Sequence, residues 1–291
     1  EAALDGLADI LGIGQSSYLF KKFVETEKAI QASASHPAAE HAGEFSLIVL
    51  PYPGQTLSEF ELEIRNTLDE FQAVGVNEID LIKFKAGRES DVINGLASVS
   101  GKVSQLANYQ FMFGNPNLIN QDLQRYLDIS AADVMRVFNI YIKEKSSVIM
   151  SYLPGEEVLP AKADNFFNGV DTLNSTEKVD YGNLTYQKAK DLFDRSIQPT
   201  AGPRPILKVP EYWEASFENG LKIIGTANNE IPTTSLLLTL NGGHRLDAYD
   251  PSKSGLASLT AGMLNESTEK YSSEDIQEEL RKLGSSIYVS S

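Results

Sequence analysis

The stretch Gly255-Leu256-Ala257-Ser258-Leu259-Thr260-Ala261-Gly262-Met263-Leu264 decides how this chain is interpreted. Its small and apolar residues predict a helix, on which positions 258 and 262 share one face because they lie four residues apart. The polar or smallest side chains of this helix, at Ser258, Ala261 and Gly262, are a hydroxyl, a methyl group and a hydrogen atom, and none of them can act as a base.

Two further segments have a recognisable order of glycines and apolar residues. Near the start the chain reads Leu11-Gly12-Ile13-Gly14-Gln15-Ser16-Ser17-Tyr18-Leu19-Phe20. Before the predicted helix it reads Gly242-Gly243-His244-Arg245-Leu246-Asp247, and Leu283-Gly284-Ser285-Ser286 follows it.

These segments resemble the motifs of insulinase-type (pitrilysin-like) zinc metallopeptidases. The helix is similar to the family's G-x-A-H-x-x-E-H-M-L…G-T, in which the two histidines bind zinc and the glutamate activates water. Gly255, Ala257, Met263, Leu264 and Thr268 match this motif. The resemblance places Ser258 and Gly262 at the two ligand positions and Ala261 at the position of the base, and these residues cannot hold zinc or act as a base. The start of the chain is similar to L-G-G-G-x-S-S-R-L-F, which opens the family's second domain type. The resemblance implies the second domain, followed by the front of a degenerate third domain, of a two-repeat, single-chain member.

The position of the family's substrate-gripping residues supports this placement. In the fourth domain of large members, an arginine and a tyrosine after the L-F pair grip the substrate. Counted from Leu19-Phe20, these positions hold Glu27 and Gln31, which are wrong for that role. The resemblance therefore implies a second domain and not a fourth.

We expect an α+β fold of two units, each a largely antiparallel sheet packed with helices, metallopeptidase-like, with the second unit truncated. Residues 1–155 form the second-type domain, 156–209 a linker with a short helix at 186–193, and 210–291 the start of the degenerate amino-terminal-type domain. Hydrophobic periodicity predicts helices at 16–28, 56–74, 77–113 with a break near 95–101, 117–127, 131–142, and 273–283. It predicts strands at 30–35, 43–50, 147–153, 213–217, 221–226, 233–240 and 286–291.

Local signals refine these elements. Thr56 with Glu59 predicts a capping box, and Gly75 predicts a left-handed helix end. Ser130 is a predicted N-cap. Asn219-Gly220 predicts a type I′ hairpin turn. The run Leu236-Leu237-Leu238 implies a strand with two buried faces.

Composition excludes several classes of partner. The formal net charge of −15 argues against nucleic acid or an anionic membrane surface, because the chain has no basic stripe. There are no cysteines, so neither a disulfide framework nor a thiolate metal site can form. No apolar run approaches the roughly 18 residues that cross a bilayer. Because the chain opens without a signal-like start, we expect a piece of a longer protein, with any targeting segment upstream. The resemblance implies an exported, periplasmic bacterial protein.

Other candidate sites have simpler explanations. His36 and His41 are five residues apart, which places them on different helix faces, and Pro37 disfavours a helix; we expect a polar β-turn there. His244 is expected to be an exposed loop residue. Ser258 has no neighbouring base in the sequence. Gly12-Ile13-Gly14 lacks the third glycine of a nucleotide loop and predicts a turn.

The resemblance implies a non-catalytic segment of a zinc-dependent metallopeptidase, which cleaves peptides in an enclosed chamber on an upstream H-x-x-E-H domain. No catalytic or metal-binding residue is assigned, and no substrate-binding residue can be nominated. This segment needs no cofactor, whereas zinc is expected in the parent. The expected partners are peptide substrates of the parent and the rest of its own chain. The alternative is an inactive structural or assembly homologue, such as a processing-peptidase partner or a respiratory-complex core-type subunit.

Overall fold

The computed structural model describes residues 1–39, 41–152, 209–246 and 249–291, together with 185, 194, 196–198, 200, 202–204 and 206. The chain forms two compact units. One comprises Glu1–Ile149 and Asn229–Ser291, and the other comprises Met150–Asn228. The predicted division into 1–155, 156–209 and 210–291 stays a prediction. The helix predicted at 186–193 lies outside the described residues.

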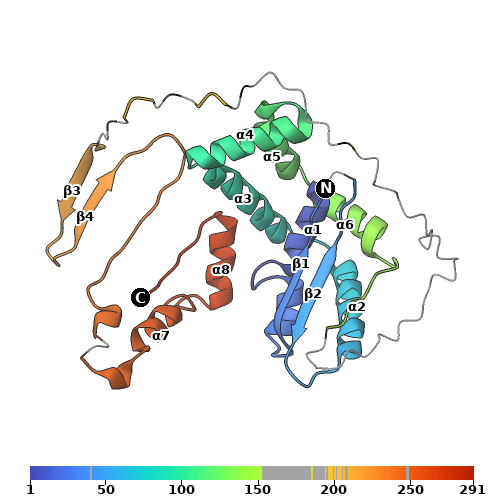
Figure 1. Ribbon diagram of the computed structural model, residues 1–291. Helices are drawn as coiled ribbons and strands as arrows, with labels where there is room; N and C mark the ends of the chain where they lie inside the picture. The colour runs from blue at the N-terminus through green and yellow to red at the C-terminus, as the bar shows by residue number, and fades with distance from the viewer. Residues whose placement is uncertain are drawn as a thin grey trace. The chain divides into compact units, whose positions relative to one another are not determined.

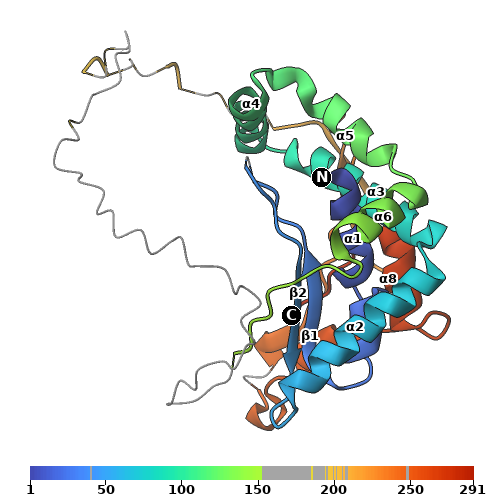
Figure 2. The same cartoon turned by 90° about the vertical axis from the view of Figure 1, so that its right-hand side faces the viewer.

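The first unit is built on a β-hairpin. β1 (Ala29–Ser35) pairs antiparallel with β2 (Ser46–Pro51), with Ala32 opposite Val49. The alanines of β1 at positions 29, 32 and 34 are buried, and their small side chains let a helix approach closely. That helix is α1 (Ala2–Gly12), which the sequence analysis did not predict. Figure 2 shows α1, α2 and α6 on the same side of the hairpin.

Helices make up most of the remaining chain up to residue 142 (Figure 1). The α-helices are α2 (Leu57–Val74), α3 (Glu78–Gly95), α4 (Val99–Phe113), α5 (Ile119–Leu127) and α6 (Ala131–Val137). Two π-helical turns lie at Phe20–Val24 and Phe138–Ile142, and a 3-10 turn lies at Pro116–Leu118. The break predicted near 95–101 separates α3 from α4.

The helix ends confirm some of the predicted signals and correct others. Ser130 caps α6 in a full capping box with Asp133. The capping box predicted at Thr56 is wrong, because its side chain makes no capping hydrogen bond. Gly75 ends α2 at φ 79° and ψ −170°, so it has positive φ but does not take the left-handed helical conformation that was predicted.

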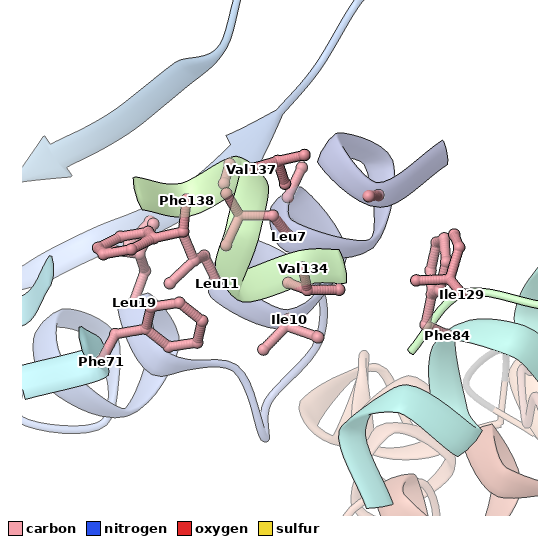
Figure 3. Packing of buried hydrophobic residues seen from close by; sticks show 14 of the residues in the cluster. Leu7, Ile10, Leu11, Leu19, Phe71, Phe84, Ile129, Val134, Val137 and Phe138 are labelled. Atoms are coloured by element: carbon pink, nitrogen blue, oxygen red, sulfur yellow. The ribbon is translucent and has the colours of Figure 1, made fainter. Parts of the chain in front are cut away.

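The hydrophobic core lies between α1, the hairpin and helices α2, α3 and α6 (Figure 3). Phe71 is fully buried at its centre and contacts Tyr18 and Phe138 edge-on, each at a ring-centroid distance of 5.1 Å. Leu7, Leu11 and other residues of α1 fill the space between α6 and the hairpin. Most of α1 is buried, and its polar face is limited to Asp5 and Asp9, which lie four residues apart.

The remainder of this unit carries α7 (Leu256–Met263) and α8 (Ser273–Lys282), with 3-10 turns at Gly243–Leu246 and Pro251–Lys253. The strands predicted at 233–240 and 286–291, and the described part of that at 147–153, are wrong. Leu236 and Leu237 are each 93% exposed. A strand requires a neighbour that accepts its backbone hydrogen bonds, and none pairs with these segments among the described residues.

The second unit contains an antiparallel hairpin of β3 (Tyr212–Ser216) and β4 (Lys222–Thr226). Its predicted type I′ turn is wrong, because Gly220 has φ +85° whereas Asn219 keeps a negative φ. The Gly220 N–H donates to the Phe217 carbonyl, which gives a loop longer than two residues that needs only one left-handed residue.

The predicted α+β class is confirmed. Across the described ranges, no helix is both long enough and apolar enough to span a membrane.

Candidate functional site

Helix α7 carries the three positions at which a zinc helix would have its ligands and its base. It begins after Gly255, which takes the left-handed conformation at φ 87°. Ser258 and Gly262 are exposed, whereas the Ala261 side chain is buried. The predicted helix is confirmed, and the two exposed positions lie four apart in the sequence, so they share one face. Neither side chain belongs to the Cys, His, Asp and Glu set that binds zinc in proteins.

An asparagine ties the end of α7 to the last residues of the chain. The Asn265 side-chain amide donates to the carbonyls of Ala261 and Val289, each at 3.0 Å. Its side-chain oxygen accepts from the Val289 N–H at 2.9 Å. Thr268, which matches the family's G-T position, accepts from the backbone N–H of Tyr271 at 3.0 Å and so shapes the turn before α8. The remaining frame residues therefore support local structure.

Zinc does not fit the residues present here. Among the residues that the structure describes, no group of three or more His, Cys, Asp or Glu side chains could hold a metal ion. Ser258, Ala261 and Gly262 supply no strong ligand of their own. We therefore assign no zinc chemistry to α7.

His36 has a structural role that the sequence did not reveal. Its side chain is only 7% exposed, and its Nδ1 lies 2.6 Å from Asp5 Oδ1. The other Asp5 oxygen accepts a hydrogen bond from the Tyr126 hydroxyl at 2.8 Å. Ala38 bridges to Gly43 beyond it, and His36 itself joins α1 to the hairpin. The polar β-turn predicted here includes Glu40, which lies outside the described residues.

The other residues singled out in the sequence do not gather with His36. His41 is exposed in the turn after β1. The backbone of His244 lies in a 3-10 turn, and its side chain is outside the part of the chain that the structure describes. Glu27 and Gln31 are exposed and are not brought together with α7 residues by any described contact.

A polar cavity of about 190 Å³ lies between α3, α4 and α5. The Arg88 guanidinium stands 4.2 Å from the centre of the Tyr126 ring, and Tyr109 donates to Asp122 at 2.8 Å. Burial, together with the Asp122 contact, raises the pKa of Tyr109 to about 12. Burial also raises the pKa of Tyr126 well above its usual range. Neither phenol can therefore act as a base near neutral pH, and the cavity contains no nucleophile paired with a base.

Sequence reasoning missed Asp5, Tyr126 and Arg88, which lie far from His36 along the chain. The available signal was weak: a histidine followed by proline within a turn does not reveal its partner.

The structural role of Gly12 is clearer. An added Cβ there would stand 1.9 Å from the backbone nitrogen of Ala34, so the glycine permits close contact between α1 and β1. Gly14, at φ +82°, supplies the predicted turn.

Comparisons with known proteins agree with the motif resemblance. The chain is 26% identical over 162 residues to the zinc protease PqqE of Helicobacter pylori (strain ATCC 700392 / 26695), an alignment that covers 53% of this chain and 35% of that protein. The chain is thus a homologue of a zinc protease, which agrees with the family resemblance. No family model matches the sequence.

Two solved structures are also similar to this chain. A protease from Helicobacter pylori has 27% identity, covers 49% of this chain and 34% of that one, and has a TM-score of 0.44. An inactive domain of peptidase M16 from Pseudomonas fluorescens has 16% identity, covers 48% and 33%, and has a TM-score of 0.40. The chain spans about a third of the length of its curated relative PqqE, of which the alignment covers 35%.

Proposed function

We propose that this chain is a non-catalytic segment of a zinc-dependent metallopeptidase, in which a different domain of the same protein carries the H-x-x-E-H helix and cleaves peptides. The observation that carries the proposal is α7. It keeps the zinc-helix frame and its geometry, with Ser258 and Gly262 at the ligand positions and Ala261 at the position of the base. The homology to a zinc protease supports the same assignment.

In this proposal the segment contributes structure to a peptide-holding enclosure and takes no part in bond cleavage. Its strong acidity, at a net charge of −15, is compatible with peptide substrates and unfavourable for nucleic acid. We also propose an exported, periplasmic location for the whole protein. The motif resemblance supports this location, and fractionation of cells that express the whole protein would test it.

The proposal is tested on the whole protein. Elemental analysis is expected to find about one zinc per chain, and an unfolded fluorogenic peptide is expected to be cleaved. The variants Ser258→Ala and Gly262→Ala should leave both the zinc content and the cleavage rate within about twofold, because neither residue holds the metal. Alanine at either histidine of the catalytic H-x-x-E-H helix is the matched control and should abolish both.

Two outcomes would overturn the proposal. If the whole protein holds no zinc and cleaves no peptide, the chain belongs to an inactive structural or assembly homologue, which is the alternative function. If Ser258→Ala abolishes cleavage while the protein remains folded and loaded with zinc, then α7 takes part in the reaction.

A further inference from the structure

Helix α8 lies beside α3 and the segment that follows α1 (Figure 1). Near its first turn, the Lys21 ammonium is 2.6 Å from the Glu274 carboxylate. Near its last turn, Arg281 Nη2 is 2.6 Å from Asp9 Oδ1, and its Nη1 donates to the Ile13 carbonyl, also at 2.6 Å. The contacts thus extend along most of the helix.

A buried lysine meets the middle of α8. Lys83 is 2% exposed; its Nζ lies 2.6 Å from Asp80 Oδ1 and 3.8 Å from Glu278 Oε2, and it donates to Ser16 Oγ at 2.8 Å. A hydrogen bond from Lys282 lowers the pKa of Glu278, which keeps this carboxylate charged. The cation on α3 therefore faces anions both from its own helix and from α8.

The three charged residues of α8 that contact α3 and the α1 region form one stripe. Glu274, Glu278 and Arg281 are spaced by four and then three residues, which places them on one face of the helix. Opposite them stand Lys21, Lys83 and Asp9, so each charge meets its opposite. If α8 were reversed end to end, Arg281 would face Lys21 and Glu274 would face Asp9. The charge pattern therefore selects one direction for the helix.

The backbone at the end of α8 fits equally closely. The Ser90 hydroxyl donates to the Gly284 carbonyl at 2.8 Å. Gly284 has φ +57°, and an added Cβ would stand 2.7 Å from the Ala86 carbonyl oxygen. Glycine is required here both for its conformation and for the close approach of α3.

The contact between α8 and its surroundings differs from the core. The buried hydrophobic cluster draws all of its members from positions 2 to 138, and α8 contributes no buried residue. The ion pair at the first turn is about half exposed, with Lys21 and Glu274 each at 46%, whereas the contacts of Lys83 and Arg281 farther along the helix are more buried. Polar, partly solvated contacts of this kind are screened by salt and resemble transient interfaces more than a fused core.

We propose that Asp9, Gln15, Lys21, Lys83 and Ser90 form a docking surface that recognises helix α8 of the same chain by its charge register and releases it reversibly. Gln15 completes this surface, because its side-chain oxygen accepts from Ser273 at 3.0 Å. The residues of this surface lie between positions 9 and 90, whereas its occupant is the helix at 273–282. Docking therefore decides whether these two parts of the chain move together, and it does not depend on the peptidase assignment.

Spin labels can measure this docking, because the chain has no native cysteine. Cysteines replace two exposed glutamates, Glu59 on α2 and Glu279 on α8, and pulsed dipolar spectroscopy gives the distribution of distances between them. We expect one narrow distribution at low salt. It should broaden in about 1 M salt, where the Debye length falls to about 3 Å.

Charge reversal then identifies the contacts. Lys21→Glu and Glu274→Lys should each broaden the distribution, and the double variant should restore it. Because the Lys21–Glu274 pair is exposed, its variants test the proposal even where a variant at a more buried contact, such as Arg281→Glu, fails to fold. Arg136→Glu is the control, because Arg136 is 57% exposed and, in the described part of the chain, its ion pair is with Asp133 of the same helix, α6.

The results also separate the two possible occupants. Unchanged distances in both single reversals, or no recovery in the double variant, would overturn the proposal. A mixture of singly labelled chains should give no dipolar signal. A signal between chains would show that α8 of a second copy occupies the surface, which would overturn docking within one chain.

Discussion

Replacing Lys83 by methionine is expected to destabilise the first unit through the charge that it leaves behind. The lysine side chain is 2% exposed, and its Nζ lies 2.6 Å from Asp80 Oδ1. Methionine fills much of the same space but cannot pair with the carboxylate. Asp80, itself 17% exposed, would then be an anion in a poorly solvated position.

The magnitude follows from how well water can replace the lysine. Removing one partner of a fully buried ion pair costs about 3–5 kcal/mol. Asp80 and Glu278 keep some contact with solvent, at 17% and 30%, so we expect a loss of about 2–3 kcal/mol after this discount. With a urea m-value of about 2 kcal/mol/M, the unfolding midpoint should fall by about 1–1.5 M.

Urea unfolding followed by circular dichroism measures this loss. The double variant Lys83→Met with Asp80→Asn should recover much of it, because the uncompensated charge is gone. Lys22→Met is the matched control: Lys22 pairs with Glu70 at the surface, 36% and 56% exposed, and should lose less than about 1 kcal/mol. If the urea unfolding midpoint of Lys83→Met lies within about 0.2 M of that of the unsubstituted chain, the reasoning is refuted.

Three further predictions concern the same unit. Phe71→Ala should cost about 3–5 kcal/mol in urea unfolding because its side chain is fully buried, whereas Phe111→Ala, at an 84% exposed position, should cost under about 0.5 kcal/mol; equal losses would contradict the assigned core. Gly12→Ala should lower stability by about 1–3 kcal/mol, because its Cβ would overlap the backbone of β1, and an unchanged melting temperature would contradict that close contact. Hydrogen bonds from Ser130 lower the pKa of Asp133, so this cap stabilises α6 at pH values above the ordinary pKa of 3.8, and the stabilisation is lost as the pH falls through the lowered pKa. The difference in melting temperature between the unsubstituted chain and Ser130→Ala should therefore shrink between pH 6 and pH 3. A constant difference would count against the cap.

Elements whose signals are local could be predicted from the sequence. Ser130 was predicted as an N-cap and forms a capping box with Asp133, whereas Thr56 with Glu59 has the same spacing and forms none. The β1–β2 hairpin is also local, because its two strands follow one another in the chain. In such cases the residues that decide the structure are neighbours in the chain.

Elements that depend on distant partners could not be predicted in the same way. The Leu236-Leu237-Leu238 run has the composition of a buried strand, yet these leucines are exposed, because composition does not supply a neighbouring strand. The opposite error occurred at α1. This helix is buried on most sides by segments far along the chain, and its polar face consists of Asp5 and Asp9 alone, a weaker signal than the broad polar face of a surface helix.

The candidate sites show how far an argument from spacing extends. The spacing of five residues was enough to exclude His36 and His41 as a helical zinc pair, because it does not depend on any partner. It could not show that His36 would be buried against Asp5, 31 residues earlier. On α8, the spacing of Glu274, Glu278 and Arg281 is present in the sequence but is equally typical of a solvated helix face, and only the contacts with Lys21, Lys83 and Asp9 distinguish the two. An exposed helix with its charges ordered along one face carries half of an interface, and the missing half can be sought as the complementary order elsewhere in the chain.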